Sequence, residues 1–142
     1  MDEGEAAAQH HGNCSTCDAL MLPELVRVHS ARGARDIALV AVEKLEAIAL
    51  DSCSLAWTAM AKQARGRYLK AVGDQEAAGV VLCEAEEAYA TYGDVYEAAR
   101  CRLARSQVVS TPKLASDLES SARKTLTRLG VLRIEGESTG SF

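Results

Sequence analysis

The chain has few of the residues that build β-sheets or interrupt helices. Aromatic residues make up 4% of its 142 residues, and its two prolines are Pro23 and Pro112. Alanine, in contrast, occurs 25 times. Because sheets draw on β-branched and aromatic residues while alanine favours helices, this composition predicts closely packed helices. We expect one all-α domain, since the length leaves no room for a second large one.

Long basic runs and long apolar runs are also missing. Lys and Arg number 16 against 20 Asp and Glu, and the net charge of −4 argues against direct nucleic-acid binding or a basic membrane-binding helix. No uncharged apolar stretch approaches the roughly 20 residues that cross a bilayer. The first residues are acidic, and no apolar run of signal-peptide length follows them. We therefore expect a cytoplasmic protein without a membrane span.

The folded part is expected at residues 14–130, between a disordered acidic start (1–13) and a flexible tail (131–142). Apolar residues recur there at helical spacing in six segments, separated by Gly, Asp, Ser or Pro. These segments span about residues 18–32, 34–50, 54–72, 75–92, 94–109 and 112–129. Asp18 is the expected N-cap of the first, and Asp51 and Ser52 are expected to end the second. The pattern predicts three antiparallel helical hairpins.

An alanine lies near the start of each second helix of a pair, at Ala38, Ala78 and Ala115. These positions are 40 and 37 residues apart, the length of one helix pair. A small side chain lets two helices approach closely where they cross. The three alanines are therefore expected to mark equivalent crossings in a stack of hairpins.

Residues 57–90 resemble a tetratricopeptide repeat, with departures at Ala90, where that family usually has proline, and at Lys62 and Arg65. The residues that carry the resemblance, and that it implies pack the repeat, are Gly66, Leu69, Gly73, Asp74, Ala78, Leu82 and Ala85. The wider string GDQEAAGVVLCEAEEAYATYGDVYEAARCRLARS is similar to the tetratricopeptide-like helical region of bacterial LuxR-type large transcriptional regulators. This resemblance extends over about residues 14–130.

The resemblance implies a short superhelix whose concave side, formed mainly by the first helix of each pair, contacts a protein. In LuxR-type regulators such a region is a sensing and assembly module before a helix-turn-helix domain. Residues 131–142 cannot hold a recognition helix, and no G-x-x-x-x-G-K-[ST] string occurs. We therefore expect a scaffold for protein–protein interaction or self-association, without direct DNA binding and without enzymatic activity.

Four N-terminal residues, His10, His11, Cys14 and Cys17, have metal-ligand spacing. Cys-x-x-Cys supplies two soft ligands, but no second pair closes the site. We assign no cofactor and keep a metal- or redox-responsive sensor as an alternative. A small-molecule effector module is a further alternative. His29 and the carboxylate run at residues 84–87 lack the partners that catalysis needs.

The last hairpin carries the expected interface. Its fifth segment is expected to turn three arginines mostly outward, and the sixth is expected to leave an apolar end uncovered. The residues concerned are Arg100, Arg102, Arg105, Leu114, Leu118 and Leu126. Because uncapped repeat arrays associate, these residues predict a homodimer or a stable complex with another protein.

Overall fold

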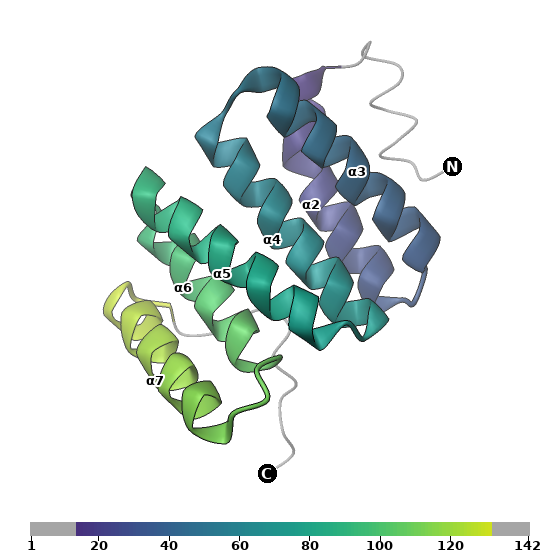
Figure 1. Ribbon diagram of the computed structural model, residues 1–142. Coiled ribbons are helices and arrows are strands. Elements are labelled where there is room, and N and C mark those ends of the chain that lie inside the picture. The colour runs from purple at the N-terminus through teal and green to yellow at the C-terminus, as the bar shows by residue number, and fades with distance from the viewer. Residues whose placement is uncertain (1–13, 132–142) are drawn as a thin grey trace.

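The structure, a computed structural model, describes residues 14–131. Within this range it has six α-helices and no strand, which confirms the all-α prediction (Figure 1). The helices are α2 (Ser15–Ala31), α3 (Arg35–Ser52), α4 (Leu55–Val72), α5 (Gln75–Tyr92), α6 (Val95–Ser106) and α7 (Pro112–Arg128). The expectations for residues 1–13 and 132–142, His10 and His11 among them, lie outside the described residues.

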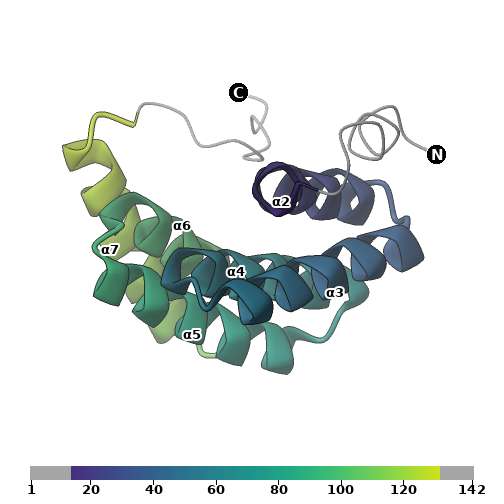
Figure 2. The ribbon, with the colours of Figure 1, turned by 90° about the horizontal axis from the view of Figure 1, so that it is seen from above.

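Successive helices are antiparallel and form three hairpins, α2/α3, α4/α5 and α6/α7 (Figure 1). Seen from above, the array is curved, with α2, α4 and α6 on its inner side, α3 and α5 on its outer side, and α7 at one end (Figure 2). Each helix packs against the next, and α2 also packs against α4 of the following hairpin. Small core clusters between neighbouring helices hold the stack together, as in other helical repeats.

Two turns of the same design flank α5. Gly73 (φ 92°) ends α4 and Gly93 (φ 94°) ends α5, both in the left-handed conformation that glycine adopts without strain. The next residue caps the following helix: Asp74 Oδ1 accepts from Ala77 N at 3.1 Å, and Asp94 Oδ1 accepts from the backbone amide of Glu97 at 2.9 Å. The repeated Gly-Asp pair thus sets both ends of α5.

Small residues allow the close crossings. Ala38 and Ala78 are fully buried, and the Gly66 backbone of α4 lies against the buried side chain of Leu82 on α5. Ala115 is only partly buried, so it is not the equivalent of the other two alanines. The third hairpin is different because α6 is short, and α7 meets it through Ala122 instead.

Three helix boundaries differ from the predicted ones by more than one residue. Helix α2 begins at Ser15 with Cys14 as N-cap, so Asp18 lies inside its first turn, where its buried carboxylate pairs with Lys44 of α3 at 3.0 Å. Helix α3 includes Asp51 and Ser52 and ends at Cys53, whose φ of 52° is left-handed. Helix α6 ends at Ser106, where the predicted segment ran to residue 109.

Helix α7 covers the apolar side of α6 and turns a hydrophilic side outward. Leu126 is buried with Ala99, Leu103 and Ala122, so it cannot serve as a surface residue. The exposed positions of α7 are mainly polar, among them Ser116, Asp117, Glu119, Ser120, Ser121, Lys124 and Arg128. Its apolar exposure is limited to Leu114 (40%), the partly buried Leu118, and Leu129 (46%) just after it. The expected uncovered apolar end is therefore largely capped by α7 itself.

Candidate functional site: the inner side of helix α4

A chain of hydrogen bonds joins α4, α5 and α6 beneath the inner side. The Tyr89 hydroxyl donates to Gln63 Oε1 at 3.2 Å, and Gln63 Nε2 donates to Glu97 Oε2 at 2.7 Å. The other carboxylate oxygen of Glu97 accepts from Arg100 Nη1 at 2.8 Å, and Arg100 lies 5.5 Å from the centroid of the Tyr96 ring. Because Gln63 and Tyr89 are buried, these bonds satisfy groups that would otherwise destabilise the core. They also fix the three helices around the inner side.

Arg67 lies one turn after Gln63 on α4. It interacts electrostatically with Glu97 and Arg100 of α6 and with Glu24 of α2. It makes no hydrogen bond or ion pair with any residue in the range 14–131. Burial, and after it repulsion from Arg100, lowers the pKa of the Arg67 guanidinium. The fold therefore holds a positive charge there under an electrostatic penalty.

Lys70 continues the same stripe three residues later. Its ammonium donates to the neutral side chain of Gln107, just after α6, and it has no carboxylate partner among residues 14–131. Burial lowers the pKa of Lys70 as well. Two partly desolvated cations therefore follow one another along the inner side of α4.

Cations on the outer side of α4 are paired. Arg65 binds Glu46 of α3 through two bonds of 2.8 and 2.6 Å, and Lys62 binds Glu84 of α5 at 2.6 Å. The ion pair and hydrogen bonds to Glu46 raise the pKa of Arg65 despite its partial burial. The same helix thus pairs its outward cations with carboxylates, whereas its inward ones form no ion pair with residues 14–131.

Two other cations on the inner side form ion pairs within their own helix. Arg27 pairs with Glu24 on α2 at 2.7 Å, and Arg100 pairs with Glu97 on α6. Burial acts against the charged form of Arg100, but the Glu97 pair and the Tyr96 ring outweigh it and raise its pKa. Arg67 and Lys70 are the cations of α4 on this side, and neither forms an ion pair with residues 14–131.

The arginines expected at an interface lie in different surroundings. Arg102 and Arg105 face α5, where Glu86 accepts from both at 2.7 and 3.2 Å, and both are largely buried. They hold α6 on α5 and do not turn outward. Arg100 lies on the inner side, away from that pair.

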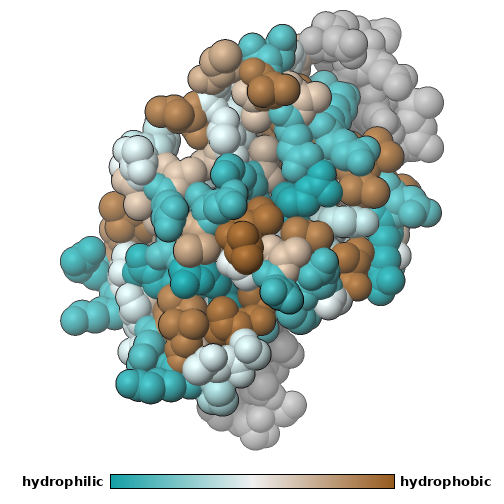
Figure 3. Space-filling view, in the orientation of Figure 1, coloured by the Kyte–Doolittle hydropathy of each residue, from teal (hydrophilic) through white to brown (hydrophobic). Residues whose placement is uncertain are grey.

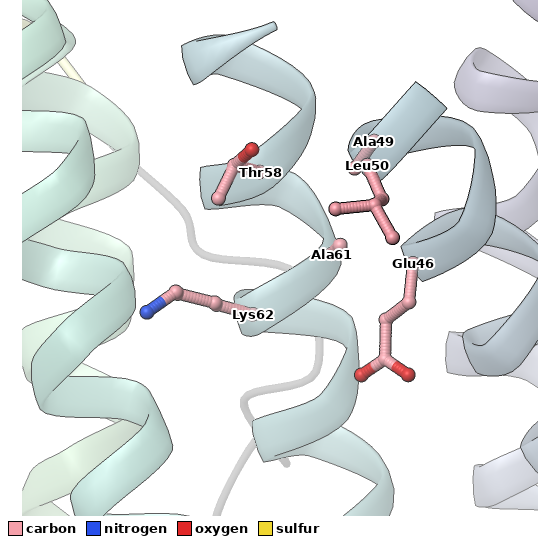
Figure 4. A pocket seen from close by; sticks show the side chains of 6 residues that line it. All are labelled: Glu46, Ala49, Leu50, Thr58, Ala61 and Lys62. Atoms are coloured by element: carbon pink, nitrogen blue, oxygen red, sulfur yellow. The ribbon is translucent and has the colours of Figure 1, made fainter. Parts of the chain in front are cut away.

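A hollow of about 350 Å³ lies between α3 and α4 on the outer side (Figure 4). Ala49, Leu50 and Ala61 give it apolar walls, while Glu46 and Lys62 at its edge already hold Arg65 and Glu84. The Thr58 hydroxyl donates to the Ser54 carbonyl at 2.8 Å. Each polar side chain that lines this hollow thus already takes part in a hydrogen bond or ion pair within the described chain. The outer face around it alternates small apolar patches with hydrophilic side chains (Figure 3).

Cys14 and Cys17 are exposed at the start of α2. Hydrogen bonds from the backbone and side chain of Cys17 lower the pKa of Cys14, and the pKa of Cys17 is raised in turn. A lowered thiol pKa at a helix N-terminus favours the reactive thiolate. No group of three metal-binding side chains occurs in residues 14–131, so any metal site would need ligands outside that range.

Sequence reasoning missed Gln63, Arg67, Lys70 and Glu97. The one available signal was the run of cations at residues 62, 65, 67 and 70, which a helical wheel divides between two opposite sides of α4. Which of these cations find a carboxylate close enough for an ion pair depends on α2, α3, α5 and α6, and no local pattern in α4 indicates that.

No protein-family model, no curated protein and no solved structure matches this chain. None of the helices in residues 14–131 is both long and apolar enough to cross a membrane.

Proposed function

We propose that this chain is a tetratricopeptide-like scaffold that binds a protein through the inner side of α2, α4 and α6. It would serve as a module of a bacterial transcriptional or signalling regulator, acting by binding and assembly without covalent chemistry. The observation that carries the proposal is the curved array, in which α2, α4 and α6 line the inner side and α4 carries Arg67, a partly buried cation that makes no ion pair with residues 14–131 (Figure 2). The resemblance of residues 57–90 to a tetratricopeptide repeat supports the same surface.

A buried charge without a partner destabilises the folded state, so buried charged side chains are usually paired within the fold. This chain pairs Arg65, Arg102 and Arg105 in this way but not Arg67. Glu97 and Glu24 interact with Arg67 electrostatically but form no ion pair with it, and a partner carboxylate that does so would account for the difference. Self-association through α7 would have only Leu114, Leu118 and Leu129 as apolar contacts, which makes the inner side the better-supported surface.

Site-specific photocrosslinking tests the proposal. Benzoylphenylalanine replaces Tyr96, which is 41% exposed beside Arg100 on the inner side, or Val80, which is 56% exposed on outer helix α5. In bacterial cells we expect one discrete crosslinked protein from position 96, reduced by Arg67→Gln, and no such product from position 80. Equal products from both positions, or none from position 96, would contradict the proposal.

The two alternatives remain predictions with less support. A thiol or metal sensor would use Cys14 and Cys17, which are both exposed. Within residues 14–131, no group of three metal-binding side chains supplies further ligands. A small-molecule receptor would use the hollow at α3 and α4, whose polar groups are already engaged.

A further inference from the structure

Independently of the proposed function, we infer that Cys14 and Cys17 form a reversible redox site, in which a low-molecular-weight disulfide oxidises the two thiols to one internal disulfide. Cys14 is the N-cap of α2, and Cys17 is the third residue of that helix. Both side chains are exposed, so a small oxidant can reach them. The site is compatible with the scaffold function because it uses no residue of α4 or α6.

The first turn of α2 brings the two cysteines within reach of a disulfide. The backbone amide of Asp18 donates to the Cys14 carbonyl at 3.0 Å, so the turn that contains both cysteines is closed. In such a turn, Cα atoms three residues apart lie about 5 Å apart, and a disulfide needs about 4.4–6.8 Å between its Cα atoms. Cys14 has the extended backbone of an N-cap (φ −73°, ψ 102°), which turns its side chain back toward the third residue of the helix. There the Cys17 thiol donates a hydrogen bond to the Cys14 sulfur.

The two thiols differ in a way that gives them separate roles. Backbone and side-chain hydrogen bonds from Cys17 lower the pKa of Cys14, although partial desolvation and the charge of Asp18 act in the opposite direction. The pKa of Cys17 is raised, first by its hydrogen bond to Cys14 and then by the charge on Cys14. Cys14 is therefore the thiolate that attacks an oxidant, and Cys17 is the thiol that completes the reaction.

Oxidation takes two thiol–disulfide exchanges. The Cys14 thiolate attacks one sulfur of the small disulfide, whose S–S bond breaks, and one half leaves as a thiolate. The Cys17 thiol loses its proton to solvent, and its sulfur attacks Cys14 Sγ, which releases the second half. The chain loses two electrons and two protons, and the small disulfide gains both and becomes two thiols. An excess of the small thiol reverses the reaction and restores both cysteines.

The other cysteines lack this arrangement, and the pair lacks further metal ligands. Cys53 is exposed but has no cysteine within one helical turn, burial raises the pKa of the partly exposed Cys83, and Cys101 is buried. No group of three metal-binding side chains occurs within residues 14–131. A disulfide needs only two sulfurs, so the described residues are sufficient for it.

Glutathione redox buffers applied to the full chain test the inference. Samples equilibrated without air at several ratios of glutathione to glutathione disulfide are quenched with acid, alkylated and digested with trypsin. Mass spectrometry then follows the peptide of residues 1–27, which contains both cysteines. We expect this peptide to lose two hydrogens, with an oxidised fraction set by the square of the glutathione concentration divided by the concentration of its disulfide, as an internal disulfide requires. A mixed disulfide, expected at Cys53, depends on the first power and adds one glutathione.

Single variants separate the two roles. Cys17→Ser should trap the mixed disulfide at Cys14 and slow its release by at least about a hundredfold, because the internal attack is lost. Cys14→Ser should slow the reaction of the same peptide with glutathione disulfide by at least about tenfold. Cys53→Ser, which removes an exposed single cysteine, is the matched control and should change this peptide's oxidation by less than about twofold. Circular dichroism of every variant ensures that only folded protein is compared.

Three results would overturn the inference. The first is a mixed disulfide at Cys14 that is as long-lived in the wild type as in Cys17→Ser. The second is a disulfide that joins Cys14 to Cys53. The third is one zinc ion per purified chain that protects Cys14 and Cys17 from glutathione disulfide until a chelator is added. Loss of the crosslinked partner from position 96 would bear on the proposed function alone.

Discussion

Gly66, whose side chain is a single hydrogen atom, allows α4 and α5 to pack closely. A Cβ at this position would lie 2.6 Å from Leu82 Cγ and 2.7 Å from its Cδ2, and Leu82 is fully buried. We expect Gly66→Ala to lower the free energy of unfolding by about 1–3 kcal/mol, because overpacking outweighs the gain in helix propensity. Urea denaturation followed by circular dichroism measures the change.

Gly79 is the matched control, since it also lies inside a helix, α5. A Cβ there would lie 3.8 Å from Val108, an ordinary van der Waals contact. Gly79→Ala should therefore stabilise the protein by up to about 1 kcal/mol. If the two substitutions shift stability in the same direction by similar amounts, the close α4–α5 crossing is not what Gly66 provides.

The cysteines differ by position in how readily they react. Cys101 is fully buried, and burial, followed by the charge of Glu97, raises its pKa to about 12. Cys14 is exposed and its pKa is lowered by hydrogen bonds from Cys17. At neutral pH we expect iodoacetamide to modify Cys14 first and to leave Cys101 unmodified until urea unfolds the chain. Peptide mass spectrometry of timed samples checks this order, which early labelling of native Cys101 would contradict.

At the scale of the element, α7 acts as the cap of the array. Leu126 is its largest fully buried side chain and packs with Ala122 on Ala99 and Leu103 of α6. We expect Leu126→Ala to cost about 2–5 kcal/mol, since it leaves a cavity in this contact. Leu118, only partly buried, provides the control, and Leu118→Ala should cost less than half as much. Thermal unfolding of both variants measures the difference, and equal losses would show that α7 is seated differently.

Local sequence patterns predicted the helices and their order, but not which side chains of different helices contact each other. Apolar periodicity and the Gly-Asp pairs at residues 73–74 and 93–94 were enough to predict six helices and their hairpin pairing. The prediction that α7 crosses its neighbour at Ala115 was wrong, because α6 is short and α7 contacts it through Ala122. The outward placement of Arg102 and Arg105 was wrong because Glu86, on a different helix, lies within reach of both. Such contacts depend on residues of other helices, which the apolar periodicity of one helix cannot identify.

At the scale of the whole molecule, stability should fall under alkaline conditions. Cys101 and Tyr89 stay protonated in the folded state, because burial raises the pKa of both, but they ionise in the unfolded chain. The unfolded state thus binds fewer protons at high pH. The stabilisation that the protonated Cys101 thiol gives the folded state is fully present below its ordinary pKa of 9.0. It is lost progressively as the pH rises toward the folded-state pKa of about 12.

Urea denaturation at several values above about pH 9 measures this slope, which can reach about 1.4 kcal/mol per pH unit for each group. Cys101→Ala and Tyr89→Phe should each flatten the slope, even if they lower stability at neutral pH. An unchanged slope in both variants would contradict the assignment.

We propose above all that the inner side of α2, α4 and α6 binds a protein partner. Amide shifts of ¹⁵N-labelled full-length protein, titrated with the protein captured by crosslinking from position 96, locate the contact on the fold. We expect shifts concentrated around Arg67 on α4 and around Arg100 on α6, with α3 and the outer side of α5 unaffected. Shifts centred on α3 and α5, or none at a saturating concentration of the captured protein, would contradict the proposal.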